Sequence, residues 1–160
     1  MTARVARIDA DLLLGTIVAF RDRMRDHEEE VNALNVFPIP DGDTGTNLLL
    51  TLDSALAAAD HPEFTPDGDG IALTSHHLPS AREATKARPV DLSKLCEELS
   101  HGMILGARGS SGVILSQAVA AALDVIVSST EQLGGTLVAA LQQAASAAYQ
   151  AVARPVEGTM

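Results

Sequence analysis

The sequence has little of what builds a disulfide framework, an aromatic core or a nucleic-acid surface. Its single cysteine, Cys96, excludes an internal disulfide and suits a reducing compartment. There is no Trp, and aromatic residues make up only 2%, so Leu, Ala, Val and Ile must fill the core. Lys and Arg number 11 against 21 Asp and Glu, which gives a formal charge of −10. A nucleic-acid footprint needs clustered basic residues, so we expect no nucleic-acid partner.

A secretion signal and a long apolar run are also missing from the pattern. Arg4 and Arg7 are followed by Asp9 and Asp11 instead of an uninterrupted apolar region. No segment comes near the ~18 to 20 apolar residues that cross a bilayer. We therefore expect a cytoplasmic protein with no transmembrane segment.

Apolar residues at helical spacing are what the sequence does contain. They make up 46% of 160 residues, enough for one globular domain, and strand-like alternation is nowhere sustained. Asp9 is placed to cap a first helix, with Ile8 and Leu13 flanking the cap as a hydrophobic staple. Asp91 is placed in the same way before a later helix. The composition and spacing predict an all-α fold.

Breaks between the helices predict how this domain is organised. A helix is expected after the loop 35–47, another ends within 102–106, and a break at 133–135 precedes a last helix over about 136–153. Residues 61–90 are rich in Pro, Gly, Asp and His and predict an irregular loop or insertion. The economical architecture is an antiparallel up-and-down helical bundle or barrel over 1–160.

The stretch NVFPIPDGDTGTN, residues 35–47, carries the first chemical signal. Asp41 and Asp43 are separated only by Gly42, and carboxylates this close repel unless a cation lies beside them. Mg²⁺ fits best, because it is commonly held by one or two carboxylates together with phosphates and water. An EF-hand loop is excluded because its glycine and glutamate positions would be Thr46 and Leu52. The alternative without a metal is an ordinary Asp-Gly turn in which Asp43 or Thr44 caps the following helix.

A phosphate site is expected next to this turn. Thr44, Thr46 and Asn47 begin a helix whose free N–H groups and positive dipole end could receive a phosphate. The second glycine-rich stretch, GARGSSGV at 106–113, also joins two helices, and its backbone amides and serines could contact an anion. It is not a Walker A loop, and it does not follow a strand as a dinucleotide fingerprint does. Both stretches should lie at the same end of the bundle.

Other polar residues are not expected to carry chemistry. PDGD recurs at 66–69, where it reads as a solvated turn, and Cys96 lies between Leu95 and Leu99 on a helix, where it faces the core. Four histidines have no metal-ligand partner at helical spacing and are expected on the surface or in linkers: His61, His76, His77 and His101.

Three segments, LNVFPIPDGDTGTN, GMILGARGSSGVILSQ and RPVEGTM, together resemble the N-terminal nucleotide-binding domain of bacterial fatty acid kinases, which is related to the ATP-binding subunit of dihydroxyacetone kinases. The resemblance covers the chain except 61–90. It implies an up-and-down barrel of about eight helices that holds ATP with two Mg²⁺ ions at one end. Asp41 and Asp43 take metal-ligand positions, and Asn35 stands near the place of a further aspartate in dihydroxyacetone kinases. The nucleotide-facing positions are Thr44, Asn47, Ser110, Ser111, Gly112, Thr159 and Met160.

The resemblance also implies an activity and partners. The acceptor would be a fatty-acid carboxylate delivered by a lipid-binding carrier protein, and no catalytic base is needed because the carboxylate is itself the nucleophile. The chain stops at Met160 inside a motif that continues in those kinases, so we expect it to be truncated. The resemblance leaves room for a homodimer through further domains. The alternatives are a dihydroxyacetone kinase-type nucleotide domain and a non-catalytic helical module that binds a partner.

Overall fold

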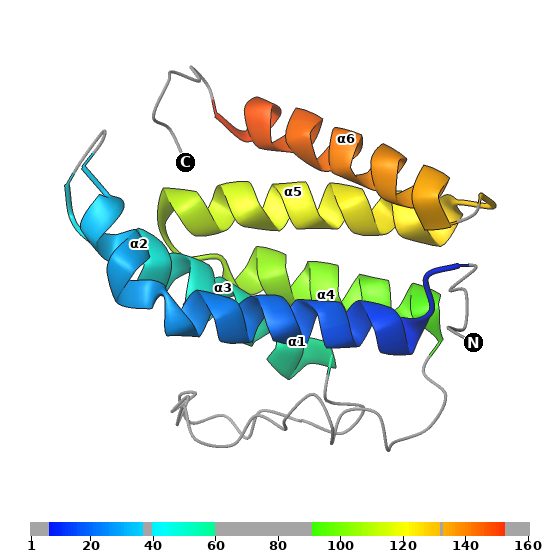
Figure 1. Ribbon diagram of the computed structural model, residues 1–160, viewed down its shortest axis with the longest axis horizontal. Coiled ribbons are helices and arrows are strands. Elements are labelled where there is room, and N and C mark those ends of the chain that lie inside the picture. The colour runs from blue at the N-terminus through cyan, green and yellow to red at the C-terminus, as the bar shows by residue number, and fades with distance from the viewer. Residues whose placement is uncertain (1–6, 37–39, 60–90, 132, 153–160) are drawn as a thin grey trace.

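The computed structural model describes residues 7–36, 40–59, 91–131 and 133–152, and all the regular structure in these ranges is helical (Figure 1). This confirms the all-α prediction. The loop or insertion predicted at 61–90 lies outside the described residues, as do Thr159 and Met160. The helices are α1 (Ala10–Asp26), α2 (Glu28–Leu34), α3 (Thr44–Ala59), α4 (Leu92–Gly106), α5 (Gly109–Ser128) and α6 (Leu133–Ala151).

Neighbouring long helices run in alternating directions, as the up-and-down prediction requires (Figure 1). The close crossing of α3 and α4 shows this in atomic detail. Gly102 lies against Ala58, whereas Gly106, one turn later on α4, lies against Ser54, one turn earlier on α3. A Cβ at Gly102 would lie 2.6 Å from the Ala58 Cβ and 2.7 Å from the Ser54 carbonyl oxygen. The small residues therefore set how closely these two helices approach.

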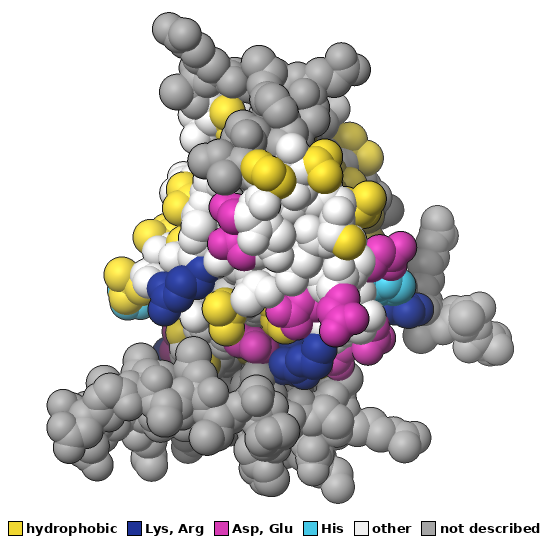
Figure 2. Space-filling model, turned by 90° about the vertical axis from the view of Figure 1, so that its left-hand side faces the viewer, with side chains coloured by type: hydrophobic (Ala, Val, Ile, Leu, Met, Phe, Trp, Pro, Cys, Tyr) yellow, Lys and Arg dark blue, Asp and Glu magenta, His cyan; other side chains and the backbone are white. Residues whose placement is uncertain are grey.

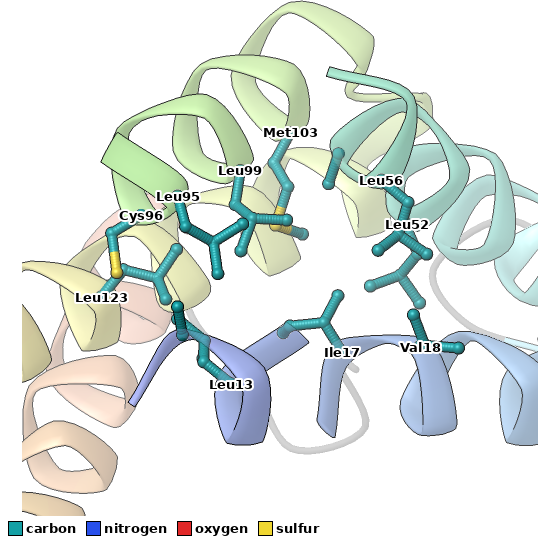
Figure 3. Close-up of a cluster of buried hydrophobic side chains, with 12 residues drawn as sticks. Leu13, Ile17, Val18, Leu52, Leu56, Leu95, Cys96, Leu99, Met103 and Leu123 are labelled. Carbon is teal, nitrogen blue, oxygen red and sulfur yellow. The ribbon is translucent and has the colours of Figure 1, made fainter. Parts of the chain in front are cut away.

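The core lies between α1, α3 and α4, with one contribution from α5 (Figure 3). Leu52, Leu99 and Met103 are at most 1% exposed, and they pack where the three helices face each other. Leu side chains dominate and none of the buried members is aromatic, as the low aromatic content predicted. The labelled members are Leu13, Ile17, Val18, Leu52, Leu56, Leu95, Cys96, Leu99, Met103 and Leu123.

Two predicted helix starts are confirmed by their capping bonds. Asp9 Oδ1 accepts a hydrogen bond from the Leu12 N–H at 2.8 Å, and Asp91 Oδ1 accepts one from the Ser93 N–H at 3.2 Å. These bonds satisfy N–H groups that have no partner inside the helix. The Asp residues thus fix where α1 and α4 begin.

One short helix lies outside the predicted elements, and one boundary differs from the prediction. The charged stretch after α1 is a separate short helix, α2, beyond a break at His27. The last helix begins at Leu133 instead of about 136, so the predicted break at 133–135 is wrong. Its first turn is fixed by Thr136, which is buried and whose hydroxyl lies 2.7 Å from the Ser129 hydroxyl. That hydroxyl contact holds the start of α6 against the end of α5.

Helices α5 and α6 expose much apolar surface. In α6 the buried residues are the small Thr136 and Ala140, whereas Leu137 and Leu141 are 46% and 61% exposed. Among the described helices, α5 is long and apolar enough to cross a bilayer by length and composition alone. The expectation that no segment comes near that length is therefore wrong for α5. Length and composition alone do not distinguish a membrane span from a helix of a bundle, and α5 packs between α4 and α6.

A buried ion pair joins α1 to α3. Arg21 is 2% exposed, and its Nη1 lies 3.4 Å from Asp53 Oδ1, which also accepts from Arg25 Nη2 at 3.4 Å. Arg21 Nε lies 2.7 Å from Asp22 Oδ1 but is not aligned for a hydrogen bond. Among the described residues, Asp53 therefore makes the one side-chain hydrogen bond to this buried guanidinium, and Asp22 is a second ionic partner.

Candidate functional site

The two glycine-rich stretches meet through the side chain of Thr51. This residue is fully buried on α3, and its hydroxyl donates to the Asn47 carbonyl oxygen at 2.7 Å. The Thr51 hydroxyl oxygen in turn accepts a hydrogen bond from the Arg108 backbone N–H at 3.2 Å. The start of α5 is thereby attached to the first turns of α3, at one end of the bundle (Figure 1). The prediction that the two stretches lie at the same end is confirmed.

The glycines of the second stretch allow this close approach. Gly109 has φ +59°, a conformation that favours glycine, and a Cβ there would collide with the Asn47 side chain. A Cβ at Gly112 would collide with the Thr51 hydroxyl. The side chains of Asn47 and Thr51 thus occupy the space that larger residues at 109 and 112 would need.

The acidic turn precedes α3 and points carboxylates to the outside. Asp41 and Asp43 are both exposed, and Gly42 between them has φ +66°, which lets the chain reverse direction. Asn35, at the end of α2, donates from Nδ2 to Asp41 Oδ1 at 2.5 Å. The structure thus brings Asn35 and Asp41 together, as a shared site requires.

The first turn of α3 is already occupied by a side chain from α2. Asn32 Oδ1 accepts from the backbone N–H of Gly45 at 2.7 Å and of Thr46 at 3.2 Å, and its Nδ2 donates to the Thr46 hydroxyl at 3.0 Å. The expectation of free N–H groups at this helix start is therefore wrong for Gly45 and Thr46. Sequence reasoning missed Asn32 because it lies 13 residues before Gly45 on a different helix, and no local pattern marks such a cap.

The first turn of α5 is different. Its cap residue, Arg108, makes no side-chain capping bond, and the first intrahelical bond runs from the Gly112 N–H to the Arg108 carbonyl oxygen at 2.9 Å. Within the described ranges, no acceptor faces the backbone N–H groups of Ser110 and Ser111. Ser110 is exposed and Ser111 is buried. Two adjacent N–H groups therefore remain as donors for an anion at the start of α5, whereas Asn32 occupies those of Gly45 and Thr46 at the start of α3.

The donor set of the acidic turn suits Mg²⁺ only together with a ligand. Among the residues described, no group of three or more His, Cys, Asp or Glu side chains could enclose a metal ion. Asp41 and Asp43 supply two hard carboxylates, and Asn35 adds an amide oxygen. Mg²⁺ is commonly held by one or two carboxylates plus phosphate oxygens and water, so the residues present fit a metal that is shared with a phosphate ligand.

The surroundings of the site are acidic. The first turn of α2 is Glu28, Glu29 and Glu30, and Figure 2, which views this end of the molecule, shows Asp and Glu side chains gathered on it. Arg108 is an exposed cation at the start of α5. A polyanion would meet unfavourable charge here unless cations accompanied it.

Curated relatives match nearly the whole chain. Protein YloV of Bacillus subtilis is 35% identical over 156 residues, which cover 98% of this chain but 24% of that protein. Uncharacterized proteins from several Staphylococcus aureus strains, USA300 among them, are 31% identical over the same fractions. The chain therefore spans about a quarter of the length of these relatives (24%).

A family comparison covers more than half of the chain. The model of the DAK2 domain matches residues 64–160, a range that includes the start of α5 but not the acidic turn. The acidic turn is covered by the matches to the longer relatives, which extend over 98% of the chain. The chain belongs to the DAK2 domain family, a kinase-related family of the dihydroxyacetone kinase type.

Proposed function

We propose that this chain is the ATP- and Mg²⁺-binding domain of a phosphotransferase similar to the fatty acid kinases. The observation that carries the proposal is the attachment, through Thr51, of the start of α5 to the first turns of α3, the helix that directly follows the acidic turn. Carboxylates for a hard cation and backbone donors for a phosphate thus lie at one end of the same bundle. Kinase-related family membership supports this use of the site.

In this proposal, the acidic side chains bind the metal and the backbone N–H groups bind the phosphate. Asp41 and Asp43 would hold the metal, with Asn35 beside them. The backbone N–H groups of Ser110 and Ser111 would donate hydrogen bonds to phosphate oxygens. The Asn47 side chain, which packs on Gly109, would orient the ligand between the two stretches. When bound, Mg²⁺ supplies the positive charge that lets a triphosphate approach this acidic end and stabilises charge on the transferred group. Phosphoryl transfer then depends on positioning more than on a covalent nucleophile.

We further propose that the phosphoryl acceptor is a fatty-acid carboxylate presented by a lipid-binding carrier protein. Two Mg²⁺ ions are part of this proposal, as the resemblance to fatty acid kinases implies. A carboxylate acceptor needs no general base, because it is itself the nucleophile. The product would be an acyl phosphate.

Calorimetric titration of the full chain with ATP, with and without Mg²⁺, tests the binding proposal. We expect binding with Mg²⁺ and at least about tenfold weaker binding without it, because the carboxylates repel the bare triphosphate. Asp41→Asn and Asp43→Asn should each lose Mg²⁺-dependent binding while keeping the helical circular dichroism spectrum. Asp124→Asn is the matched control, because it removes one exposed carboxylate about 20 Å farther along α5.

The acceptor is tested separately by mass spectrometry of the products. The full-length relative that carries this domain, supplied with MgATP and a lipid-loaded carrier protein, should yield an acyl phosphate. Phosphorylation of dihydroxyacetone in place of the fatty acid would assign the domain to the other kinase type. Absence of Mg²⁺-dependent ATP binding by the folded wild-type chain would reject both.

A further inference from the structure

The short helix α2 holds both ends of the acidic turn, and Asn32 is the residue through which it does so. On one side, the Asn32 carbonyl oxygen accepts from the Asn35 N–H at 3.2 Å, and the Asn35 side chain donates to Asp41. On the other side, the Asn32 side chain caps the first turn of α3. The backbone of Asn32 thus contacts the Asn35–Asp41 side of the turn, and its side chain contacts the helix start that follows Asp43.

The α3 side of this arrangement determines where Asp43 lies. Asp43 immediately precedes the helix, and its carbonyl oxygen already accepts the Asn47 N–H at 2.8 Å. Its backbone is thus part of the first helical turn, and the Asn32 cap orders that turn from outside. A displacement of the cap would move Asp43 together with the helix start.

A second contact from α2 completes the attachment. The Thr46 hydroxyl donates to Glu28 Oε1 at 2.6 Å and accepts from Asn32 Nδ2. A Cβ at Gly45 would lie 2.5 Å from the Glu28 carbonyl oxygen and 3.1 Å from Asn32 Oδ1. Only glycine at 45 lets α2 approach closely enough for Asn32 to reach the backbone of α3.

We propose that Asn32 is a positioning residue, which fixes the separation of Asp41 and Asp43 and thereby presets the turn for a metal–nucleotide ligand. This inference rests on the proposed function for its ligand, but its structural part concerns the ligand-free protein. Asn32 orders the turn before the ligand binds. Without Asn32, ligand binding must itself order the turn, and that free-energy cost weakens the affinity for the ligand.

Amide hydrogen exchange in the ligand-free full chain tests the structural part. In Asn32→Ala the N–H groups of Gly45 and Thr46 lose their acceptor, and we expect their exchange to accelerate about tenfold. Asn32→Asp keeps an acceptor oxygen at the same reach, and it should restore slow exchange at both residues. Unchanged exchange in Asn32→Ala would overturn the inference whatever the nucleotide does.

Calorimetric titration of the same variants with MgATP tests the functional part. Asn32→Ala should bind MgATP about tenfold more weakly than wild type, and Asn32→Asp should return to within about threefold of it. Gly102→Ala is the control for general destabilisation, because it disturbs the α3–α4 crossing away from the turn. A purely structural role for Asn32 predicts equal losses in Asn32→Ala and Gly102→Ala at matched stability, which would also overturn the inference.

The two levels of failure are distinguishable. If wild-type protein shows no Mg²⁺-dependent ATP binding, the proposed function fails and the positioning role fails with it. If wild type binds and Asn32→Ala binds equally well, only the positioning role fails. Thr46→Val adds a further check, because it removes the hydroxyl that joins Asn32 to Glu28 and should produce a smaller loss in the same direction.

Discussion

At the scale of single residues, the site depends on places where a side chain would not fit. Gly109 combines a positive φ with the packing of Asn47 over its Cα. Replacing it affects both the backbone conformation and the space between α3 and α5. The geometry of the site therefore requires glycine at position 109, because a side chain there would collide with Asn47.

Gly109→Ala should therefore lower the free energy of unfolding by about 1 to 2 kcal/mol, the usual cost of a left-handed conformation with a Cβ. Gly134→Ala in the first turn of α6 is the control, because a Cβ there meets nothing within 4 Å. It should leave stability unchanged or raise it by roughly 0.5 kcal/mol, since alanine is the better helix former. Urea denaturation of both variants tests this prediction. Equal stability of the two variants would contradict the close packing of Asn47 against Gly109.

Cys96 provides a pH prediction. Burial, and secondarily the negative charge of Asp124, raises the pKa of its thiol from 9.0 to about 11. The folded chain thus keeps its proton where the unfolded chain has lost it, so this residue's contribution to stability is complete below pH 9 and falls as the pH rises toward 11. Urea denaturation between pH 8 and 11 should show a steeper decline for wild type than for Cys96→Ala. Parallel pH profiles of the two proteins would show that the thiol has the same pKa in the folded and the unfolded chain.

At the scale of helices, the crossing of α3 and α4 rests on small residues facing each other. Gly102→Ala places a methyl group against the Ala58 Cβ and the Ser54 carbonyl oxygen, neither of which can move without shifting a helix. We expect a loss of about 1 to 3 kcal/mol in the free energy of unfolding, as for other overpacked contacts. Gly15→Ala in α1, with nothing within 4 Å, should instead be neutral or stabilising. Thermal melts followed by circular dichroism compare the pair, and a stable Gly102→Ala would mean that the helices cross farther apart.

Helices were predictable from the sequence wherever a local signal fixes them. Asp9 and Asp91 bond to N–H groups two or three residues ahead, so the capping pattern can be read in order along the chain. The meeting of the two glycine-rich stretches followed from helix directions alone. The Asn32 cap could not be foreseen, because its partners lie on another helix and any exposed asparagine has the same sequence appearance.

The side of a helix that becomes buried was less predictable. Leu137 and Leu141 form an apolar stripe in the sequence, yet Thr136 and Ala140 are the buried residues of α6. Close packing on α5 favours small side chains at the contact, which leaves the larger ones outside. Hydrophobic periodicity finds the helix but does not choose between an apolar face and a small face.

At the scale of the whole molecule, the formal charge of −10 raises the question of whether global repulsion or local pairing controls stability. Asp53 hydrogen-bonds to both Arg21 and Arg25, and its side chain is 16% exposed while that of Arg21 is 3% exposed. Asp22 also lies within ion-pair distance of both arginines, but its side chain is 50% exposed. Global repulsion and local pairing predict opposite signs for removal of this carboxylate. A single substitution can therefore separate them.

Asp53→Asn reduces the net negative charge but leaves the buried Arg21 guanidinium with Asp22 alone, so we expect it to lower the free energy of unfolding by about 3 kcal/mol. Arg21→Met increases the net negative charge but removes the buried cation and keeps an apolar stem, so its cost should be only about 1 kcal/mol. Urea denaturation of the two variants and of the double mutant at low and high salt gives the coupling between the pair. A stabilised Asp53→Asn, with the gain disappearing in salt, would show instead that long-range repulsion across the acidic molecule outweighs the ion pair that joins α1 to α3.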